Sequence, residues 1–177
     1  MKNRLKKIRN YCYRQIIKPL VLVNGPAYTK KYVKFLKKNG MNIIGTPLYL
    51  SSSISFDGSD YGLITLEEGC SISKGVTILT HDFSRNTVYK GLNLENESIL
   101  DTENKKNGLL DLRPVRIGSH SFIGANVFIL PGTTIGNNVI IGAGSVVRGV
   151  IPDNSIVIGN PAQVIKKTSD WLIKQKF

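Results

Sequence analysis

Residues 117–147 read IGSHSFIGANVFILPGTTIGNNVIIGAGSVV. Every sixth residue of this stretch is a large aliphatic one: Ile117, Ile123, Ile129, Ile135, Ile141 and Val147. A helix repeats every 3.6 residues and a strand every two, so neither element explains a period of six. An aliphatic residue that recurs at the first position of a hexad is typical of a parallel β-helix, in which three hexads form one coil of about 18 residues.

Two other positions of the hexad support this interpretation. A small or β-branched residue stands four places after each aliphatic, at Ser121, Val127, Thr133, Val139 and Ser145. We expect these side chains to share a narrow interior with the larger aliphatics. Glycine follows the aliphatic at positions 118, 124, 136 and 142, where we expect the chain to turn sharply. Residues 117–152 would then form two coils.

A second set of aliphatics lies on a six-residue grid nearer the N-terminus. Its members are Leu48, Ile54, Leu66, Ile72 and Ile78, with Asp60 as the one polar exception. This grid predicts two further coils over residues 48–83, and the fold class is therefore all-β. The period does not determine the handedness of the coil, although parallel strand connections are usually right-handed.

The segments outside the grids predict a domain of residues 43–167 with helical flanks. Residues 1–42 read as two short helices, the second beginning after Gly25-Pro26 and stopping at Gly40. Their apolar faces comprise Leu5, Ile8, Cys12, Ile16 and Leu20 in the first helix and Tyr28, Tyr32, Phe35 and Leu36 in the second. Residues 84–114 lose the period and form an inserted loop. Residues 168–177 read as a helix whose Trp171 and Leu172 cover the open end of the solenoid.

The charge of the chain is unevenly distributed. The formal net charge is +12, and residues 1–40 hold twelve Lys and Arg but no Asp or Glu. Clustered cations on amphipathic helices attract anionic membranes. The alternative is that the two helices cap the solenoid and leave a solvated outer face. We expect no nucleic-acid partner, because helix faces explain these lysines and tyrosines.

Composition excludes several other classes of protein. No run of 18 apolar residues and no signal peptide are present in the sequence, which favours a cytoplasmic location. The two cysteines, Cys12 and Cys70, make no disulfide framework. The two histidines, His81 and His120, cannot supply a metal site that needs three from one chain. We therefore expect no metal.

Three motifs occur in a specific order: Thr80-His81-Asp82, the run Ile141–Val147, and Gly159-Asn160-Pro161-Ala162. Together with the hexads they closely resemble the hexapeptide-repeat O-acetyltransferases, which include maltose, galactoside and nodulation-factor acetyltransferases and modifiers of capsule and lipopolysaccharide. The resemblance covers roughly residues 43–167. It implies a left-handed parallel β-helix against the usual connection rule, a homotrimer, acetyl-CoA as the donor and a saccharide as the acceptor.

The resemblance also assigns catalytic roles. It implies that His81 is the general base that takes the proton from the acceptor hydroxyl, a task suited to imidazole because imidazole titrates near neutral pH. Asp82 would orient His81, bind the acceptor or merely cap the turn, and the sequence leaves these alternatives open. His120 is expected to be an ordinary surface histidine and hence a natural negative control.

The donor site follows from spacing and resemblance together. Ala125 and Ala143 each follow an Ile-Gly pair and lie one coil apart, so we expect them to stack at one corner and leave a groove for pantetheine. In the family, the residue matching Ala125 offers its backbone N–H near the thioester, and the residue matching Ala143 contacts pantetheine. The residues expected to bind acetyl-CoA are Gly124, Ala125, Gly142, Ala143, Arg148, Lys166 and Lys167. Phe122 would flank the acceptor pocket or the seam between subunits.

The acceptor is not inherited from the sugar-specific relatives. Those proteins carry an Asn and an Asp in their N-terminal coils, whereas residues 50–55 here read LSSSIS. The loop 84–114 is therefore the candidate for acceptor specificity. Two alternatives remain open: acetylation of an antibiotic or an amino sugar by the same fold, and a non-enzymatic scaffold, against which the intact Thr-His-Asp motif argues.

Overall fold

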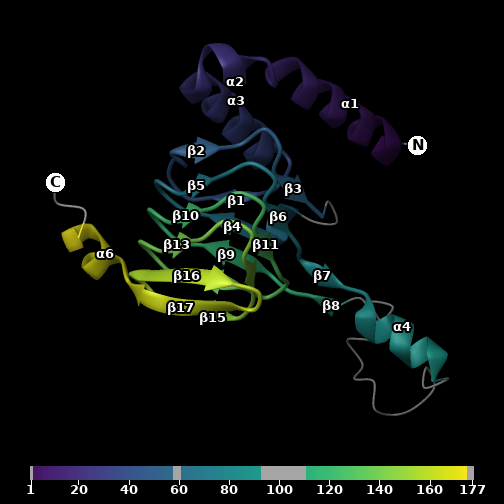
Figure 1. Cartoon of the computed structure of the whole chain (residues 1–177). Helices are drawn as coiled ribbons and strands as arrows, with labels where there is room; N and C mark the ends of the chain where they lie inside the picture. Colours follow the sequence, from purple (N-terminus) through teal and green to yellow (C-terminus); the bar gives the residue numbers. More distant parts are fainter. Residues whose placement is uncertain (1, 58–60, 93–110, 175–177) are drawn as a thin grey trace.

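The computed structural model describes residues 2–57, 61–92 and 111–174 of the chain. Three helices lead into a stack of short strands, and a hairpin and a helix follow it (Figure 1). The helices are α1 (Lys2–Ile17), α2 (Leu20–Val23), α3 (Gly25–Lys38), α4 (Ser84–Gly91) and α6 (Thr168–Lys174), and Tyr61–Leu63 form a 3-10 turn.

The strands are mostly two or three residues long. In chain order they are β1 (Asn42–Ile43), β2 (Tyr49–Leu50), β3 (Ser55–Phe56), β4 (Ile64–Leu66), β5 (Ser71–Ile72), β6 (Thr77–Ile78), β7 (His81–Asp82), β8 (Asp111–Leu112), β9 (Val115–Ile117), β10 (Phe122–Ile123), β11 (Phe128–Ile129), β12 (Thr134–Ile135), β13 (Ile140–Ile141), β14 (Val146–Val147), β15 (Val150–Ile151), β16 (Ser155–Gly159) and β17 (Ala162–Lys167).

These strands form three parallel faces around one core. Face A has the order β1-β4-β9-β12-β15, face B the order β2-β5-β10-β13-β16, and face C the order β3-β6-β11-β14. The strand β17 turns back along β16 and extends face B in the antiparallel sense. The first four coils therefore contribute one strand to each face, and the last contributes β15 to face A and β16 to face B. The predicted parallel β-helix is confirmed.

The strict grid of residues 117–147 has the predicted register. Ile117 pairs with Ile135, Ile123 with Ile141, and Ile129 with Val147, each one coil of 18 residues apart. All six side chains are fully buried, and the small or β-branched residues four places after the first five of them are buried as well. Backbone hydrogen bonds such as Phe122 N–H to Val139 O, at 2.8 Å, join successive coils.

The N-terminal grid is wrong in its first members. Leu50, not Leu48, pairs with Ile72 across face B; Leu50 has no exposed surface, whereas Leu48 is 74% exposed. Ile54 is buried, but it occupies the fourth position after Leu50. Residue 60 lies outside the described part of the chain. The first coil is longer than 18 residues, so residues 48–83 hold only part of that coil, followed by one regular coil.

The hexad glycines are needed for a different reason from the one we expected. None of the four at positions 118, 124, 136 and 142 has a positive φ. A Cβ on Gly118 would instead lie 2.4 Å from Gly136 O, and one on Gly124 would lie 2.6 Å from Ala143 N. These glycines allow successive coils to approach each other. The left-handed backbone comes two residues later, as at His120 and Asn126.

Helix α3 caps the N-terminal end of the solenoid with the predicted face. Tyr28, Tyr32, Phe35 and Leu36 are buried, and the five lysines of the helix are exposed. The side chain of Asn24 accepts a hydrogen bond from Ala27 N–H at 2.9 Å, and Gly40, with a φ of 100°, follows the last turn. Burial raises the pKa of Tyr32 to about 12, so it stays neutral in the cap.

The predicted inner face of α1 is wrong. Cys12 is exposed and Ile16 is 73% exposed, while the side chains of Leu5 and Ile8 lie outside the described part. Ile17 is buried instead, the Tyr13 ring stacks 5.3 Å from that of Phe35, and the Arg14 guanidinium lies 5.7 Å from the Tyr32 ring. Aromatic and cationic contacts therefore orient the helix and leave Cys12 and Ile16 exposed, whereas Leu20 of the predicted face is partly buried against the core.

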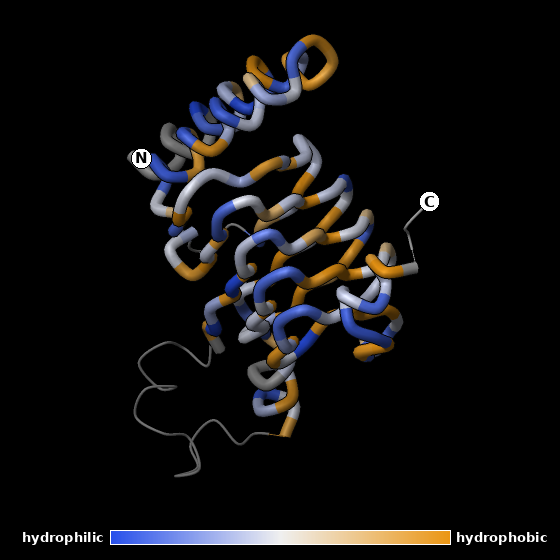
Figure 2. Tube along the Cα trace, turned by 90° about the vertical axis from the view of Figure 1, so that its left-hand side faces the viewer, coloured by the Kyte–Doolittle hydropathy of each residue, from blue (hydrophilic) through white to orange (hydrophobic). Residues whose placement is uncertain are grey.

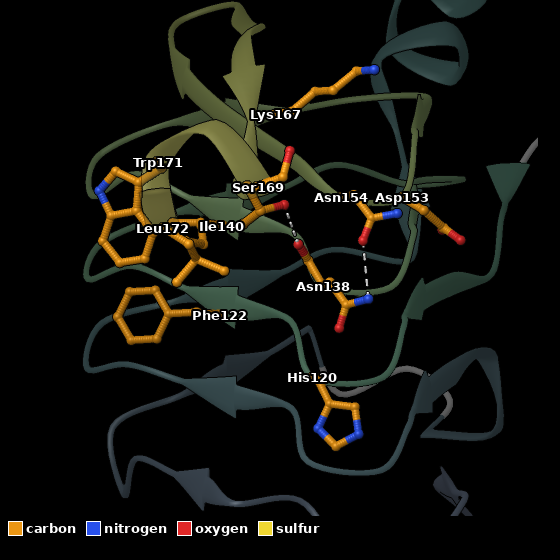
Figure 3. A pocket seen from close by; sticks show the side chains of 11 residues that line it. His120, Phe122, Asn138, Ile140, Asp153, Asn154, Lys167, Ser169, Trp171 and Leu172 are labelled. Carbon is orange, nitrogen blue, oxygen red and sulfur yellow. Dashed lines mark hydrogen bonds between the residues drawn. The ribbon is translucent and has the colours of Figure 1, made fainter. Parts of the chain in front are cut away.

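The remaining segments branch from the solenoid. Helix α4 lies in the predicted loop of residues 84–114. The antiparallel pair β7–β8 forms where the chain leaves the solenoid and returns to it. Residues 93–110 lie outside the described part. Helix α6 begins at Thr168, whose Oγ1 donates to Asn138 O at 2.9 Å. Its Trp171 lies beside Phe122 and Ile140 on face B, not over the open end as expected (Figure 3).

Within the described ranges, no helix is both long and apolar enough to cross a bilayer.

The corrected register of the first coil can be tested with two leucines. Leu50→Ala should lower the free energy of unfolding by about 2–5 kcal/mol, because it leaves a cavity under face B. Leu48→Ala, the matched control, should change it by less than about 0.5 kcal/mol, because Leu48 is exposed. Urea denaturation followed by circular dichroism measures both. The reverse order of the two effects would restore the six-residue grid.

Candidate active site

His81 lies where the chain leaves the solenoid. It follows β6 by three residues, and β7 pairs with β8 so that His81 stands opposite Leu112. Its Nδ1 atom is 2.8 Å from Oδ2 of Asp57, and its ring meets the ring of Phe83 edge-on at 4.8 Å. The His81 side chain is 21% exposed and that of Asp57 only 5%. One edge of the imidazole is thus held by the protein, and the ring remains partly accessible.

Asp57 is a site residue that the sequence analysis missed. It follows β3, and its N–H donates to Ile78 O at 3.2 Å. Its carboxylate accepts from the Thr80 hydroxyl at 2.9 Å, from Thr80 N–H and from His81. Asp57 and His81 lie 24 residues apart in the sequence, so no local motif contains both. The one available signal was the carboxylate directly after Phe56, at the end of a strand one coil above His81.

The carboxylate determines which nitrogen of His81 can act as a base. A neutral imidazole beside a carboxylate holds its proton on the facing nitrogen and donates it. In the neutral ring Nδ1 therefore donates to Asp57, and Nε2 carries the lone pair. This pairing also orients the ring, as carboxylates do in other histidine-based sites.

Asp82 caps a turn, which is one of the three roles that the sequence leaves open for it. Its Oδ1 accepts from Ser84 N–H at 2.8 Å, which caps the turn before α4. His120 lies far from this region, at the corner between faces A and B, where it is exposed and has a φ of 54°. It occupies the left-handed corner position taken by asparagine in other coils, as at Asn126 and Asn138.

The two alanines of the expected donor site stack at the corner between faces B and C. Gly144 N–H donates to Ala125 O at 2.8 Å, which joins one corner to the next. Gly124 and Ala143 approach so closely that a Cβ on the glycine would not fit. Ala143 is exposed and Ala125 half-buried, so this corner is a narrow ridge of small residues at the surface, with Gly142 beside it.

The expected cationic residues lie at other corners. Arg148 follows β14 at the corner between faces C and A, and it is exposed. Lys166 and Lys167 are exposed on β17, opposite Ile156 and Ser155, near the corner between faces A and B. One chain therefore distributes the sequence-predicted site residues over three corners and does not bring them together.

A groove of about 840 Å³ lies on face B, away from His81. Phe122, Ile140 and Trp171 form its apolar end, and His120, Asn138 and Asn154 form its polar end (Figure 3). Lys167 also lines it, so this cation lies beside α6. The sequence predicts Phe122 at an acceptor pocket or a subunit seam, and it does not indicate that Trp171 and Leu172 of α6 line the same groove.

Other reactive groups add nothing to the site. Burial raises the pKa of the Cys70 thiol to about 12, so it is no nucleophile at neutral pH. Among residues 2–57, 61–92 and 111–174, no three or more His, Cys, Asp or Glu side chains gather in a way that would hold a metal ion.

Known proteins share this repeat and this fold. Residues 114–149 match the family model described as "Bacterial transferase hexapeptide (six repeats)". A stretch of 58 residues, 33% of this chain, is 53% identical to the putative lipopolysaccharide biosynthesis O-acetyl transferase WbbJ of Escherichia coli (strain K12). A stretch of 73 residues, 41% of this chain, is 43% identical to a putative acetyltransferase of Staphylococcus aureus (strain COL).

Residues 114–149 therefore carry the repeat of the bacterial hexapeptide transferases, and this part of the chain is similar to acetyltransferases. The matched stretches cover 30% and 37% of those two relatives, so the chain matches about a third of their length. A solved galactoside acetyltransferase in complex with coenzyme A superposes with a TM-score of 0.54 at 22% identity, over 96% of this chain and 86% of that one. That likeness shows the fold, and the left-handed β-helix is confirmed.

The structural part of the His81 pair can be tested without any activity. Asp57→Ala should lower the free energy of unfolding by about 3 kcal/mol, because it removes a buried carboxylate that accepts from Thr80 and His81. Asp153→Ala is the matched control, because its carboxylate accepts from Asn137 N–H at the surface; its cost should stay below about 1 kcal/mol. Equal losses in chemical denaturation would remove Asp57 as the anchor of this corner.

Proposed function

We propose that the protein transfers an acetyl group from acetyl-CoA to a hydroxyl of a saccharide, with His81 as the general base. The observation that carries the proposal is the 2.8 Å contact between Asp57 and Nδ1 of His81, the histidine of the Thr80-His81-Asp82 motif. Similarity to a putative lipopolysaccharide biosynthesis O-acetyl transferase, and a fold shared with a galactoside acetyltransferase that binds coenzyme A, support the same chemistry.

The reaction needs one base and no covalent enzyme intermediate. Nε2 of His81 accepts the proton of the acceptor hydroxyl while the hydroxyl oxygen attacks the thioester carbonyl carbon. The tetrahedral intermediate collapses, the carbon–sulfur bond breaks, and the proton passes from Nε2 to the leaving thiolate. Asp57 stabilises the imidazolium between these two transfers, since its carboxylate lies on Nδ1.

The ridge of small residues at Ala125 and Ala143 suits the donor. Pantetheine is slender, and a corner without bulky side chains lets it lie along the backbone. In this proposal the Ala125 N–H faces the developing oxyanion, an interaction that is worth a few kcal/mol in other acyl transferases. Arg148, Lys166 and Lys167 are exposed cations that would meet the phosphates of coenzyme A.

Completion of the site requires a neighbouring protomer. His81 lies at the corner between faces C and A, whereas Ala125 and Ala143 lie at the corner between faces B and C, with face C between them. Side chains at two corners of one coil point away from each other. A homotrimer with cyclic symmetry would bring the His81 corner of one copy to the alanine corner of the next.

The acceptor in this proposal is a sugar of a cell-surface polysaccharide or of its precursor, modified in the cytoplasm. Residues 50–55 read LSSSIS here, so the proposal does not carry over the acceptor of the sugar-specific relatives. The Asp57–His81 pair is compatible with a hydroxyl acceptor, because an alcohol must lose its proton to a base as it attacks. An amine of an amino sugar or antibiotic is the alternative acceptor.

The two histidines of the chain provide a direct test. His81→Ala should lower the turnover number in a thiol-release assay with acetyl-CoA and a saccharide panel by about 10²–10⁴-fold, because the proton acceptor is lost. His120→Ala should retain wild-type turnover, since His120 lies at another corner. Equal activity of both variants would remove His81 as the base. A panel with hydroxyl and amine acceptors separates the two acceptor classes.

Subunit complementation tests the shared site. Ala143→Trp should block the donor ridge without disturbing the core, because Ala143 is exposed. Neither this variant nor His81→Ala should be active alone. When the two are unfolded, mixed in equal amounts and refolded, about a quarter of the interfaces should combine an intact His81 with an intact ridge. Recovery of about a quarter of the wild-type activity supports the trimer, whereas a mixture without activity contradicts it.

A further inference from the structure

The positive charge of the chain is concentrated on one helical layer at the N-terminal end. Residues 1–40 hold twelve Lys and Arg and no acidic residue, so the other residues sum to a net charge of zero. The five lysines of α3 are all exposed, as are Arg9 and Lys18 of α1 and its extension. Because no carboxylate lies within this segment, these cations repel one another until an anionic partner neutralises them.

The same layer exposes large apolar side chains. Leu22 is 90% exposed and Val23 is 85% exposed, at the turn where α2 joins α3. The tip they form lies at the end of the helical layer, away from the solenoid (Figures 1 and 2). Ile16 and Tyr11 on α1 are also largely exposed. An apolar tip among cations is typical of surfaces that enter the headgroup region of a membrane.

A small groove between α1 and α3 adds a site for a single anion. It has a volume of about 270 Å³ and is lined by Arg9, Asn10, Tyr13, Lys34, Phe35, Lys38 and Asn39. A hydrogen bond of 2.6 Å from Asn10 Nδ2 to Asn39 Oδ1 ties the two helices together there. Three cations and two aromatic rings without an acidic group suit the phosphate of a lipid head.

We propose that helices α1–α3 dock the protein onto an anionic phospholipid bilayer, with Leu22 and Val23 inserted between headgroups and the cations on the lipid phosphates. This layer combines an apolar tip with positive charge that no carboxylate of residues 1–40 compensates. A second copy of the same surface would be repelled by its charge. A nucleic acid would match the charge but would leave Leu22 and Val23 in water.

Vesicle sedimentation of the full chain tests the charge component. Binding to vesicles of phosphatidylglycerol and phosphatidylcholine should exceed binding to pure phosphatidylcholine, and it should weaken as salt rises. Lys34→Gln combined with Lys38→Gln should weaken it about 25-fold, since each charge near the surface contributes about fivefold. The control pair, Lys74→Gln with Lys90→Gln, removes two exposed lysines outside the layer and should change binding less than twofold.

Fluorescence tests the orientation of the docked protein. Trp171 is the single tryptophan, so Trp171→Phe gives a silent background whose fold is checked by circular dichroism. In that background, Leu22→Trp should show a blue-shifted emission and quenching by brominated lipid when anionic vesicles are added. The control Val150→Trp, at a site that is 79% exposed near the other end of the solenoid, should show neither.

A third variant distinguishes a membrane from another polyanion. Leu22→Asn combined with Val23→Asn should weaken vesicle binding about tenfold, because two apolar side chains no longer leave water. The proposal is overturned if anionic vesicles do not bind, or if the Asn pair binds them as well as wild type does. It is also overturned if single-stranded polynucleotide binds more tightly than the vesicles do. None of these measurements depends on acetyl transfer, so their outcome tests the membrane proposal separately from the proposed role of His81.

Discussion

The whole structure depends on burying one aliphatic side chain per face in every coil. Ile123 and Ile141 of face B have no exposed surface, and the same holds for Ile117 and Ile135 of face A and for Ile129 and Val147 of face C. Burial of each such side chain favours folding by about 1.5–3 kcal/mol, and the backbone groups between coils are paired at the same time. The interior is filled by these side chains and by the small or β-branched residues four places after them. Chemistry is therefore confined to the corners and outer faces.

This confinement explains the layout of the candidate site. A corner can present a side chain without disturbing the ladder, and the chain uses one corner to leave the solenoid at His81 and return at β8. The ring is oriented by Asp57, which stands one coil above on the same side and is itself fixed by Thr80. The ridge at Ala125 and Ala143 needs the opposite property, an absence of bulk. The fold supplies both properties, but at corners that face C separates.

The sequence predicted the elements whose signals are periodic and local. The strict grid fixed the register from Ile117 to Val147, and the apolar side of α3 followed from its spacing. The predictions from sequence were wrong where a local pattern conflicts with contacts that form only in the folded chain. Leu48 fits the period of six, but Leu50 occupies the inward position that pairs with Ile72, because the first coil is longer than 18 residues. The stripe of Cys12 and Ile16 is aliphatic, yet aromatic stacking and Arg14 orient α1. Asp57 was missed because its partner is close only in the folded coil.

The position of the basic layer relative to the solenoid gives the two proposals a common geometry. Helix α3 covers the first coil, so the axis of the solenoid leads away from the layer (Figure 1). A cyclic trimer with its axis parallel to the solenoids would present all three layers on one side, and three weak contacts on one bilayer reinforce one another strongly. His81 belongs to the second coil, close to that side, whereas β15 and the hairpin β16–β17 lie at the far end. An acceptor sugar attached to a lipid in the same bilayer would then reach the His81 corner over a short distance, and free acetyl-CoA would enter from water.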